Sequence, residues 1–231
     1  MIILKRKSAL AIAIIVFLLS QHQLFAGDDF NEFATRIFKK DIKGVRELID
    51  KGADVNVREK TMGSTPLILA CSRSGSYEIV KLLIANGADV NIEGSHDGRT
   101  ALMWAARESQ NTVELLLANG ADVNVKGVDG MTAFIQSIFG ILSDSVTTDV
   151  CDLLLAKGSD VNARLIGPDA AGWTALMFAT SNGKLDLVKY LISKKANVNL
   201  KAKDGTTALS LSIKDKRSDI ADVLKANGAK E

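Results

Sequence analysis

The chain repeats one short phrase, Gly-Ala-Asp-Val-Asn or a near copy of it, at almost regular intervals. Five copies and a shortened sixth are separated by 33 to 38 residues. A period of this length indicates a solenoid, in which each copy is one supersecondary unit that buries its apolar face only against its neighbours. The copies begin at Gly52, Gly87, Gly120, Gly158 and Lys195, and the shortened one at Gly228.

A second motif, Gly-x-Thr, follows each full copy after a short loop and precedes an apolar segment. Threonine in this position is typical of a helix N-cap, because its hydroxyl can accept a hydrogen bond from a backbone N–H of the first turn. Each unit is therefore expected to consist of a loop and helices. The cap residues are Thr65, Thr100, Thr132, Thr174 and Thr207.

The spacing and the wording of both motifs resemble the ankyrin repeat family. Thr65-Pro66-Leu67 stands where the family's Thr-Pro-Leu-His begins, and Thr-Ala-Leu or Thr-Ala-Phe stands in the other units. The resemblance implies an all-α fold, an ankyrin-repeat solenoid of about six helix–turn–helix units with β-turn or finger loops. The family's histidine is replaced by Ile68, Met103, Ile135, Met177 and Ser210.

The repeats divide residues 27–231 into one elongated domain. Its ends are expected to be polar caps, at residues 28–56 and 200–231, because terminal units must face solvent. Four inner repeats lie between them at 57–91, 92–124, 125–162 and 163–199.

The fourth unit is the least regular. It has 26 residues from Thr132 to Gly158 where the next two units have 21, and we place the extra residues in an enlarged inter-helix turn at 142–148. The finger loop at 163–172 is also long. Insertions in solenoids often lie on the binding face, but long loops also close at little entropic cost and need no function. Both interpretations stay open.

The amino-terminal segment has the layout of a secretory signal peptide. Lys5-Arg6-Lys7 precedes an apolar stretch of eleven residues, Ala9–Leu19, and small residues follow at Ala26-Gly27. We predict a signal peptide at 1–26 with cleavage after Ala26, which would place the protein in the periplasm or outside the cell. The alternative is an uncleaved signal anchor, and membrane contact is expected only in that case.

The net charge argues against a nucleic-acid partner. The full chain carries +2, and residues 1–26 contain three cations and no acid, so the remaining chain carries about −1. Binding to nucleic acid draws much of its affinity from clustered Lys and Arg that meet phosphates. A nearly neutral repeat domain without a basic stripe is a poor candidate.

No catalytic, metal-binding or cofactor-binding residues are predicted. His96 lies beside Asp97 in a finger loop, where a solvated pair is far more common than an acid–base pair with no third group. The repeated Asp and Asn residues suit turns and offer too few oxygens for calcium. Cys71 and Cys151 lie two units apart, too far for a disulfide bond, and are expected to be buried thiols.

A partner surface follows from the resemblance. Ankyrin repeats usually bind on the concave side, along the finger turns and the exposed edge of each first helix. Aromatic and Arg residues there are typical of interface hot spots. The alternatives are that Trp173 packs on a neighbouring finger and that Phe139 belongs to the core. The predicted partner-binding residues are Arg99, Arg107, Met131, Phe139, Leu165, Ile166 and Trp173.

Together these features predict a non-catalytic protein–protein recognition module of the cell envelope, monomeric until it binds a protein partner. A bacterial source is inferred from the short basic leader and from the lack of any Asn-x-Ser/Thr acceptor. Three alternatives remain: an immunity protein that blocks a toxin, an accessory protein for an envelope enzyme, and a signal-anchored membrane scaffold.

Overall fold

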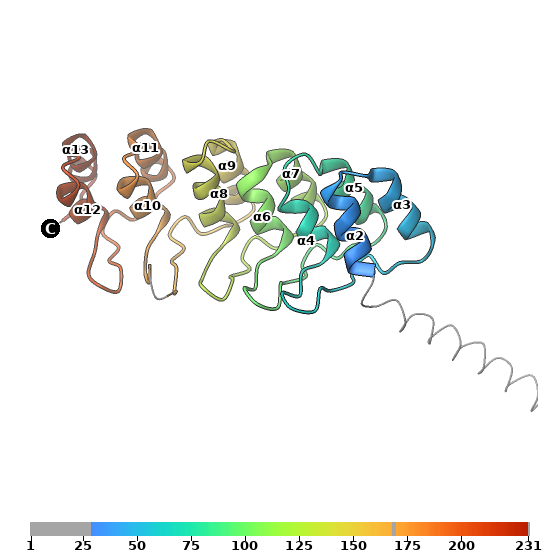
Figure 1. The fold of residues 1–231 in the computed structure, drawn as a ribbon. Coiled ribbons are helices and arrows are strands. Elements are labelled where there is room, and N and C mark those ends of the chain that lie inside the picture. The colour runs from blue at the N-terminus through green and yellow to red at the C-terminus, as the bar shows by residue number, and fades with distance from the viewer. Residues whose placement is uncertain (1–28, 168–169, 231) are drawn as a thin grey trace, which may run out of the picture.

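The computed structural model describes residues 29–167 and 170–230, so the predicted signal peptide lies outside the described residues. This part of the chain is all-helical, with twelve helices and no strand. The helices form six successive pairs that stand side by side in one row, with the long loops projecting along one edge (Figure 1). The predicted helix–turn–helix solenoid is confirmed. None of the described helices is long and apolar enough to cross a bilayer.

The first helix of each pair and its partner follow in chain order. They are α2 (Asp29–Phe38) and α3 (Ile42–Asp50), α4 (Pro66–Cys71) and α5 (Tyr77–Ala85), α6 (Ala101–Glu108) and α7 (Gln110–Ala118), α8 (Ala133–Leu142) and α9 (Thr148–Ala156), α10 (Ala175–Ser181) and α11 (Leu185–Ser193), and α12 (Ala208–Lys214) and α13 (Ser218–Ala226).

The two sequence motifs start and end the helices as expected. Each of the five cap threonines accepts a hydrogen bond from the backbone N–H three residues later, at 3.0 to 3.4 Å. The phrase-initial glycines follow the second helices with φ between 84° and 94°, a region that glycine enters without steric cost. Lys195 takes the same place with φ 70°, so this degenerate copy of the motif keeps the turn at some cost in backbone strain.

Neighbouring finger loops are joined by backbone hydrogen bonds. Ser95 N–H donates to the Met62 carbonyl at 2.8 Å, and an equivalent bond recurs at each of the next three junctions. These bonds give loops without regular strands a fixed spacing, since each finger satisfies polar groups of the next. The three later bonds run from Val128 N–H to Asp97 O, from Ile166 N–H to Asp129 O and from Lys203 N–H to Ala171 O.

The Asn that ends the repeated motif can join two successive units through hydrogen bonds of its side chain. The Asn91 side chain donates to Gly120 O at 3.1 Å and accepts from Asp122 N–H at 2.9 Å. Asn56 and Asn199 make the same pair of bonds to the loops that follow them. Asn162 makes only the second bond, and the side chain of Asn124 makes neither within the described residues. The bridges are thus incomplete on both sides of the fourth unit.

One apolar core runs through the row from Phe33 in α2 to Leu224 in α13. Each helix pair contributes a few fully buried side chains, and the core continues because every unit covers the apolar face of the one before it. Cys71 and Cys151 are buried, unpaired members of this core, as predicted.

The fourth unit departs from the sequence prediction in one respect. Of its five additional residues, three lengthen α8, which has ten residues against seven in α10, and only two enlarge the turn. The longer α8 is accommodated by Gly140, where a Cβ would lie 2.6 Å from the Arg107 carbonyl at the end of α6. The expected enlarged turn is therefore mainly an extra helical turn that lies close against α6.

Candidate binding site

The packing on the two sides of α8 is unequal. α8 packs more extensively on α6 than on α10, and the contacts of α2 with α4, of α4 with α6 and of α10 with α12 lie between these two extremes. On the α10 side, side chains leave a hollow of about 570 Å³, which we call the α8–α10 hollow. Its lining residues are Arg107, Phe139, Leu142, Ser143, Trp173, Phe178, Ser181 and Asn182.

Three aromatic rings meet at this hollow. The ring centroids of Phe139 and Phe178 are 4.9 Å apart and meet edge to face at 69°, and those of Trp173 and Phe178 are 5.0 Å apart. All three side chains are half-buried. Edge-to-face and tilted pairs of this kind are favourable because the ring edge is positive and the face negative. The cluster therefore holds its own shape while it still offers apolar surface.

The aromatic cluster rests on a small satellite core beneath the fingers. This core is formed by the buried side chains Met131, Ile135, Ala163 and Leu165, and Phe139 and Phe178 pack against it. Such support fixes the rings before any ligand arrives, which reduces the conformational entropy lost on binding.

Three of the seven residues predicted for the partner surface, Arg107, Phe139 and Trp173, lie together in the hollow. Met131 and Leu165 do not belong to an exposed strip, because their side chains are only 6% and 8% exposed. Leu165 of the long finger packs in one buried cluster with Met131, so both belong to the satellite core. Ile166 is 69% exposed but lies on a finger loop and does not line the hollow.

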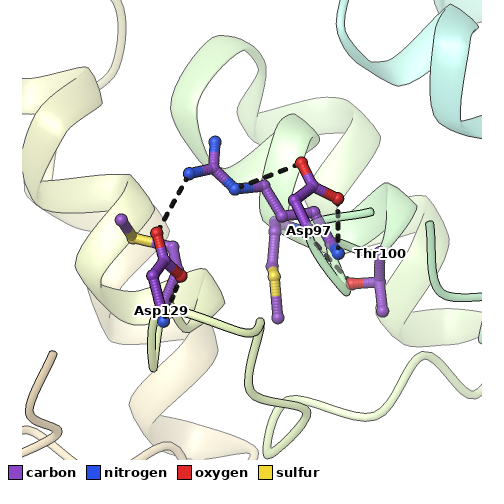
Figure 2. A network of polar contacts seen from close by, with 6 residues as sticks. Asp97, Thr100 and Asp129 are labelled. Atoms are coloured by element: carbon purple, nitrogen blue, oxygen red, sulfur yellow. Dashed lines mark hydrogen bonds and ion pairs between the residues drawn. The ribbon is translucent and has the colours of Figure 1, made fainter. Parts of the chain in front are cut away.

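Arg99 has a role that the sequence did not suggest. Its guanidinium lies 3.5 Å from Asp97 and 3.3 Å from Asp129, so it joins the second and third fingers (Figure 2). It also lies over the ring of Trp104, 5.4 Å from the centroid. Two carboxylates compensate its charge, and Arg99 is better placed to brace the fingers than to meet a partner.

Phe178 was missed by the sequence analysis, although a signal for it exists. It stands four residues after the cap Thr174, as Trp104 stands four residues after Thr100. Trp104 is half-buried against the core. Because Phe178 and Trp104 occupy equivalent positions in their repeats, the sequence could have predicted a second large ring on the same side of the first helices.

The charge at the hollow comes from one residue. Arg107 is the only ionised side chain among the lining residues, and no carboxylate in the described part of the chain lies within ion-pair distance of it. The polar rim, formed by Ser143, Ser181 and Asn182, is neutral. The hollow thus combines aromatic surface with an uncompensated positive charge.

Groups elsewhere that could carry chemistry lie apart from the hollow. His96 is exposed on a finger loop, and burial raises the pKa of the Cys151 thiol to about 11 and raises that of Cys71 as well. Thiols with such pKa values are unreactive near neutral pH. Among the described residues, no group of three or more His, Cys, Asp or Glu side chains is placed to hold a metal ion.

Comparison with known proteins accounts for this repeat pattern. The family profile described as ankyrin repeats in three copies matches residues 33–127 and again residues 129–231. The chain belongs to the ankyrin repeat family. Ankyrin repeat proteins are generally non-catalytic modules that bind other proteins.

Several curated ankyrin repeat proteins are similar to the chain over part of their length. The probable E3 ubiquitin-protein ligase XBOS33 of Oryza sativa subsp. japonica is 35% identical over 153 residues, 66% of this chain and 29% of that protein. Ankyrin repeat and KH domain-containing protein mask-1 of Caenorhabditis elegans is 31% identical over 187 residues, 80% of this chain and 6% of that protein. Ankyrin repeat and SAM domain-containing protein 6 of Rattus norvegicus is 55% identical over 40 residues, 17% and 4% of the two chains.

The chain spans less than a third of the length of these relatives. All three come from eukaryotes, so they lend no support to the bacterial source inferred from the leader. What they share with this chain is the repeat itself.

Proposed function

We propose that this ankyrin repeat protein is exported and recognises a protein partner through the α8–α10 hollow, without catalysis. The observation that carries the proposal is the partly exposed cluster of Phe139, Trp173 and Phe178 beside Arg107. Aromatic and Arg side chains that are held in place and surrounded by a polar rim are the residues that most often dominate binding energy.

Export rests on the sequence of residues 1–26 and can be tested separately from binding. Cleavage after Ala26 predicts a mature protein that begins at Gly27 and is released by opening the envelope. Amino-terminal sequencing of the protein recovered from cells checks this. Recovery of a chain that still begins with Met1 and stays with membranes after a salt wash would instead indicate the signal-anchored scaffold.

Site-specific photo-crosslinking in cells tests the binding surface. A photoreactive amino acid at the exposed rim positions Ser143 and Asn182 should trap one protein that is identified by mass spectrometry. The same amino acid at Lys189, exposed on α11, is the matched control and should not trap it. Crosslinks from Lys189 or from the finger residue Ile166, with none from the rim, would contradict recognition at the hollow.

A further inference from the structure

The proposed function leaves the chemistry of the bound segment open, and the lining of the hollow restricts it. Its apolar part is formed by aromatic rings and Leu142, and its charge by Arg107 alone. A ligand that buries itself here without a carboxylate would leave a guanidinium desolvated and unpaired, which is costly. A ligand with a carboxylate gains a charge-assisted hydrogen bond with that donor.

The shape of the hollow favours an extended segment. Its lining comes from three successive first helices, with Arg107 on α6, Phe139 and Leu142 on α8 and Phe178 on α10. Neighbouring packed helices are spaced by about 8–10 Å, so the lining runs over roughly 20 Å. An extended peptide rises about 3.3 Å per residue, and about six residues would cover that length.

The polar rim also suits a peptide backbone. The hydroxyl of Ser181 has no hydrogen-bond partner among the described residues, while Asn182 uses its amide N–H on the Phe178 carbonyl at 2.9 Å. The Asn182 amide oxygen can therefore accept from a ligand N–H. Rim groups that can donate and accept are what an extended backbone needs to keep its own polar groups paired.

We propose that the α8–α10 hollow binds an extended segment of a partner protein in which a bulky apolar side chain is followed or preceded, within about three residues, by Asp or Glu. The apolar side chain lies against Phe139, Trp173 and Phe178, and the carboxylate pairs with Arg107. This inference rests on the proposed function and adds to it the identity of the recognised chemistry.

Charge argues against one other occupant of this hollow and against one other hollow as the site of an acidic segment. Residues 1–26 of the chain are apolar but carry three cations and no carboxylate, so they do not complement Arg107. A second hollow of about 600 Å³, lined by Asp144, Lys184 and Tyr190 among others, lies between the turns of the same two units. Its Lys184 is already 3.8 Å from Asp144, and Asp186 adds a further negative charge, so it offers no comparable preference for an acid.

Fluorescence polarisation with labelled seven-residue peptides tests the assignment on the purified full chain. One peptide carries Phe and Asp two residues apart in a Gly/Ser background; the others replace Asp by Asn or by Lys. The Asp peptide should bind at least about tenfold more tightly than the Asn peptide, the value of one charge-assisted hydrogen bond. The Lys peptide should not bind up to about 1 mM.

Two variants separate charge recognition from general loss of structure. Arg107→Met should bind the Asp peptide at least about tenfold more weakly and no longer distinguish it from the Asn peptide. Lys214→Met is the matched control, because Lys214 stands at the same register position in the last unit and is exposed. It should bind both peptides as the unmodified chain does. Circular dichroism confirms that both variants are folded.

The inference would be overturned if the Asp and Asn peptides bound equally, or if Arg107→Met still distinguished them. It would also be overturned if the Asp peptide did not bind up to about 1 mM. Tighter binding in this hollow of a peptide of residues 1–26, or of a second copy of the chain, would overturn it as well. If crosslinks from Ser143 and Asn182 still appear under any of these outcomes, only the acidic preference fails. If the crosslinks are also absent, the proposed function fails with it.

Discussion

The junction of α6 with α8 and the junction of α8 with α10 are built from copies of the same repeat, yet one is tight and the other leaves a hollow. At the tight junction, the buried Gly140 of α8 lies close to α6, where even a Cβ would be 2.6 Å from the Arg107 carbonyl. At the open junction, Phe139 and Phe178 meet edge to face between the helices.

The difference shows how side-chain size decides whether a repeat interface becomes core or binding surface. The distance between packed helices depends on the side chains at their contact. Large rings that meet each other between α8 and α10 keep the backbones apart and stay partly exposed, whereas Gly140 lets α8 lie against α6. The sizes of a few side chains thus create a site in an otherwise regular row.

The largest expected effect comes from breaking the tight junction. Gly140→Val should lower the free energy of unfolding by about 3 kcal/mol, because even a Cβ at this position lies 2.6 Å from the Arg107 carbonyl and from the Val146 side chain. Urea unfolding monitored by circular dichroism measures the change.

The matched substitution on the open side is Ser181→Val, at a half-buried position of the hollow. Because the hollow leaves space beside this side chain, the free energy of unfolding of the Ser181→Val variant should stay within about 0.5 kcal/mol of that of the unmodified chain. Equal losses for the two substitutions would show that the junctions do not differ in packing as argued.

A double-mutant cycle sharpens the account of the open junction. Phe139→Leu and Phe178→Leu each keep apolar bulk but remove the ring–ring contact at 4.9 Å. Their effects on the free energy of unfolding should be non-additive, with a coupling of about 0.5–1.5 kcal/mol. Additive effects would mean that the rings stand near each other without stabilising the gap between α8 and α10.

The contrast between junctions also marks the limit of what the sequence predicted. The helix pairs could be predicted because each unit carries its own signals: a Thr that caps, a glycine at positive φ and an apolar helical face. The exposure of side chains in the finger loops could not be predicted in this way, because it depends on how the neighbouring loop packs. Arg99, Met131 and Trp173 occupy one register position, but Met131 is buried under the long finger while Trp173 is half-exposed.

The lengthened α8 was missed for a related reason. The surplus of residues between Thr132 and Gly158 is visible in the sequence, but polar residues after Leu142 suggested a loop insertion. The close approach that Gly140 allows becomes apparent only when the Arg107 carbonyl is seen beside it. Long-range contacts of this kind override local composition.

The asparagine side chains that join successive loops allow a comparison with a smaller expected effect on stability. Asn91→Ala removes two hydrogen bonds to the next loop, at 3.1 and 2.9 Å, and should lower the free energy of unfolding by about 1–2 kcal/mol. Asn124→Ala, at the equivalent position before the fourth unit, should change it by less than about 0.5 kcal/mol. Thermal and urea unfolding of the two variants in parallel check this difference, and a larger loss at Asn124 would contradict the incomplete bridge.

The smallest effect is expected where polar contacts connect α9 and α11 across the open junction. Asp152 accepts from Tyr190 Oη at 2.6 Å and lies 2.8 Å from Lys194 Nζ. The hydrogen bond and charge of Lys194, together with the Tyr190 hydroxyl, hold the pKa of Asp152 below its ordinary value of 3.8. A carboxyl with a lowered pKa in the folded state stabilises the fold above its unfolded pKa, and this contribution is lost as the pH falls through the folded value.

Stability should therefore fall between about pH 5 and pH 2 by an amount that depends in part on Asp152. Because the group is largely exposed, its share should be under about 1 kcal/mol. Asp152→Asn should reduce the pH dependence of urea unfolding in this range. Asp222→Asn serves as the control, because Asp222 is exposed on α13 and has no ion pair among the described residues. A profile that Asp152→Asn leaves unchanged would mean that the contacts of Tyr190 and Lys194 do not hold the open junction together, and that the aromatic rings alone set its width.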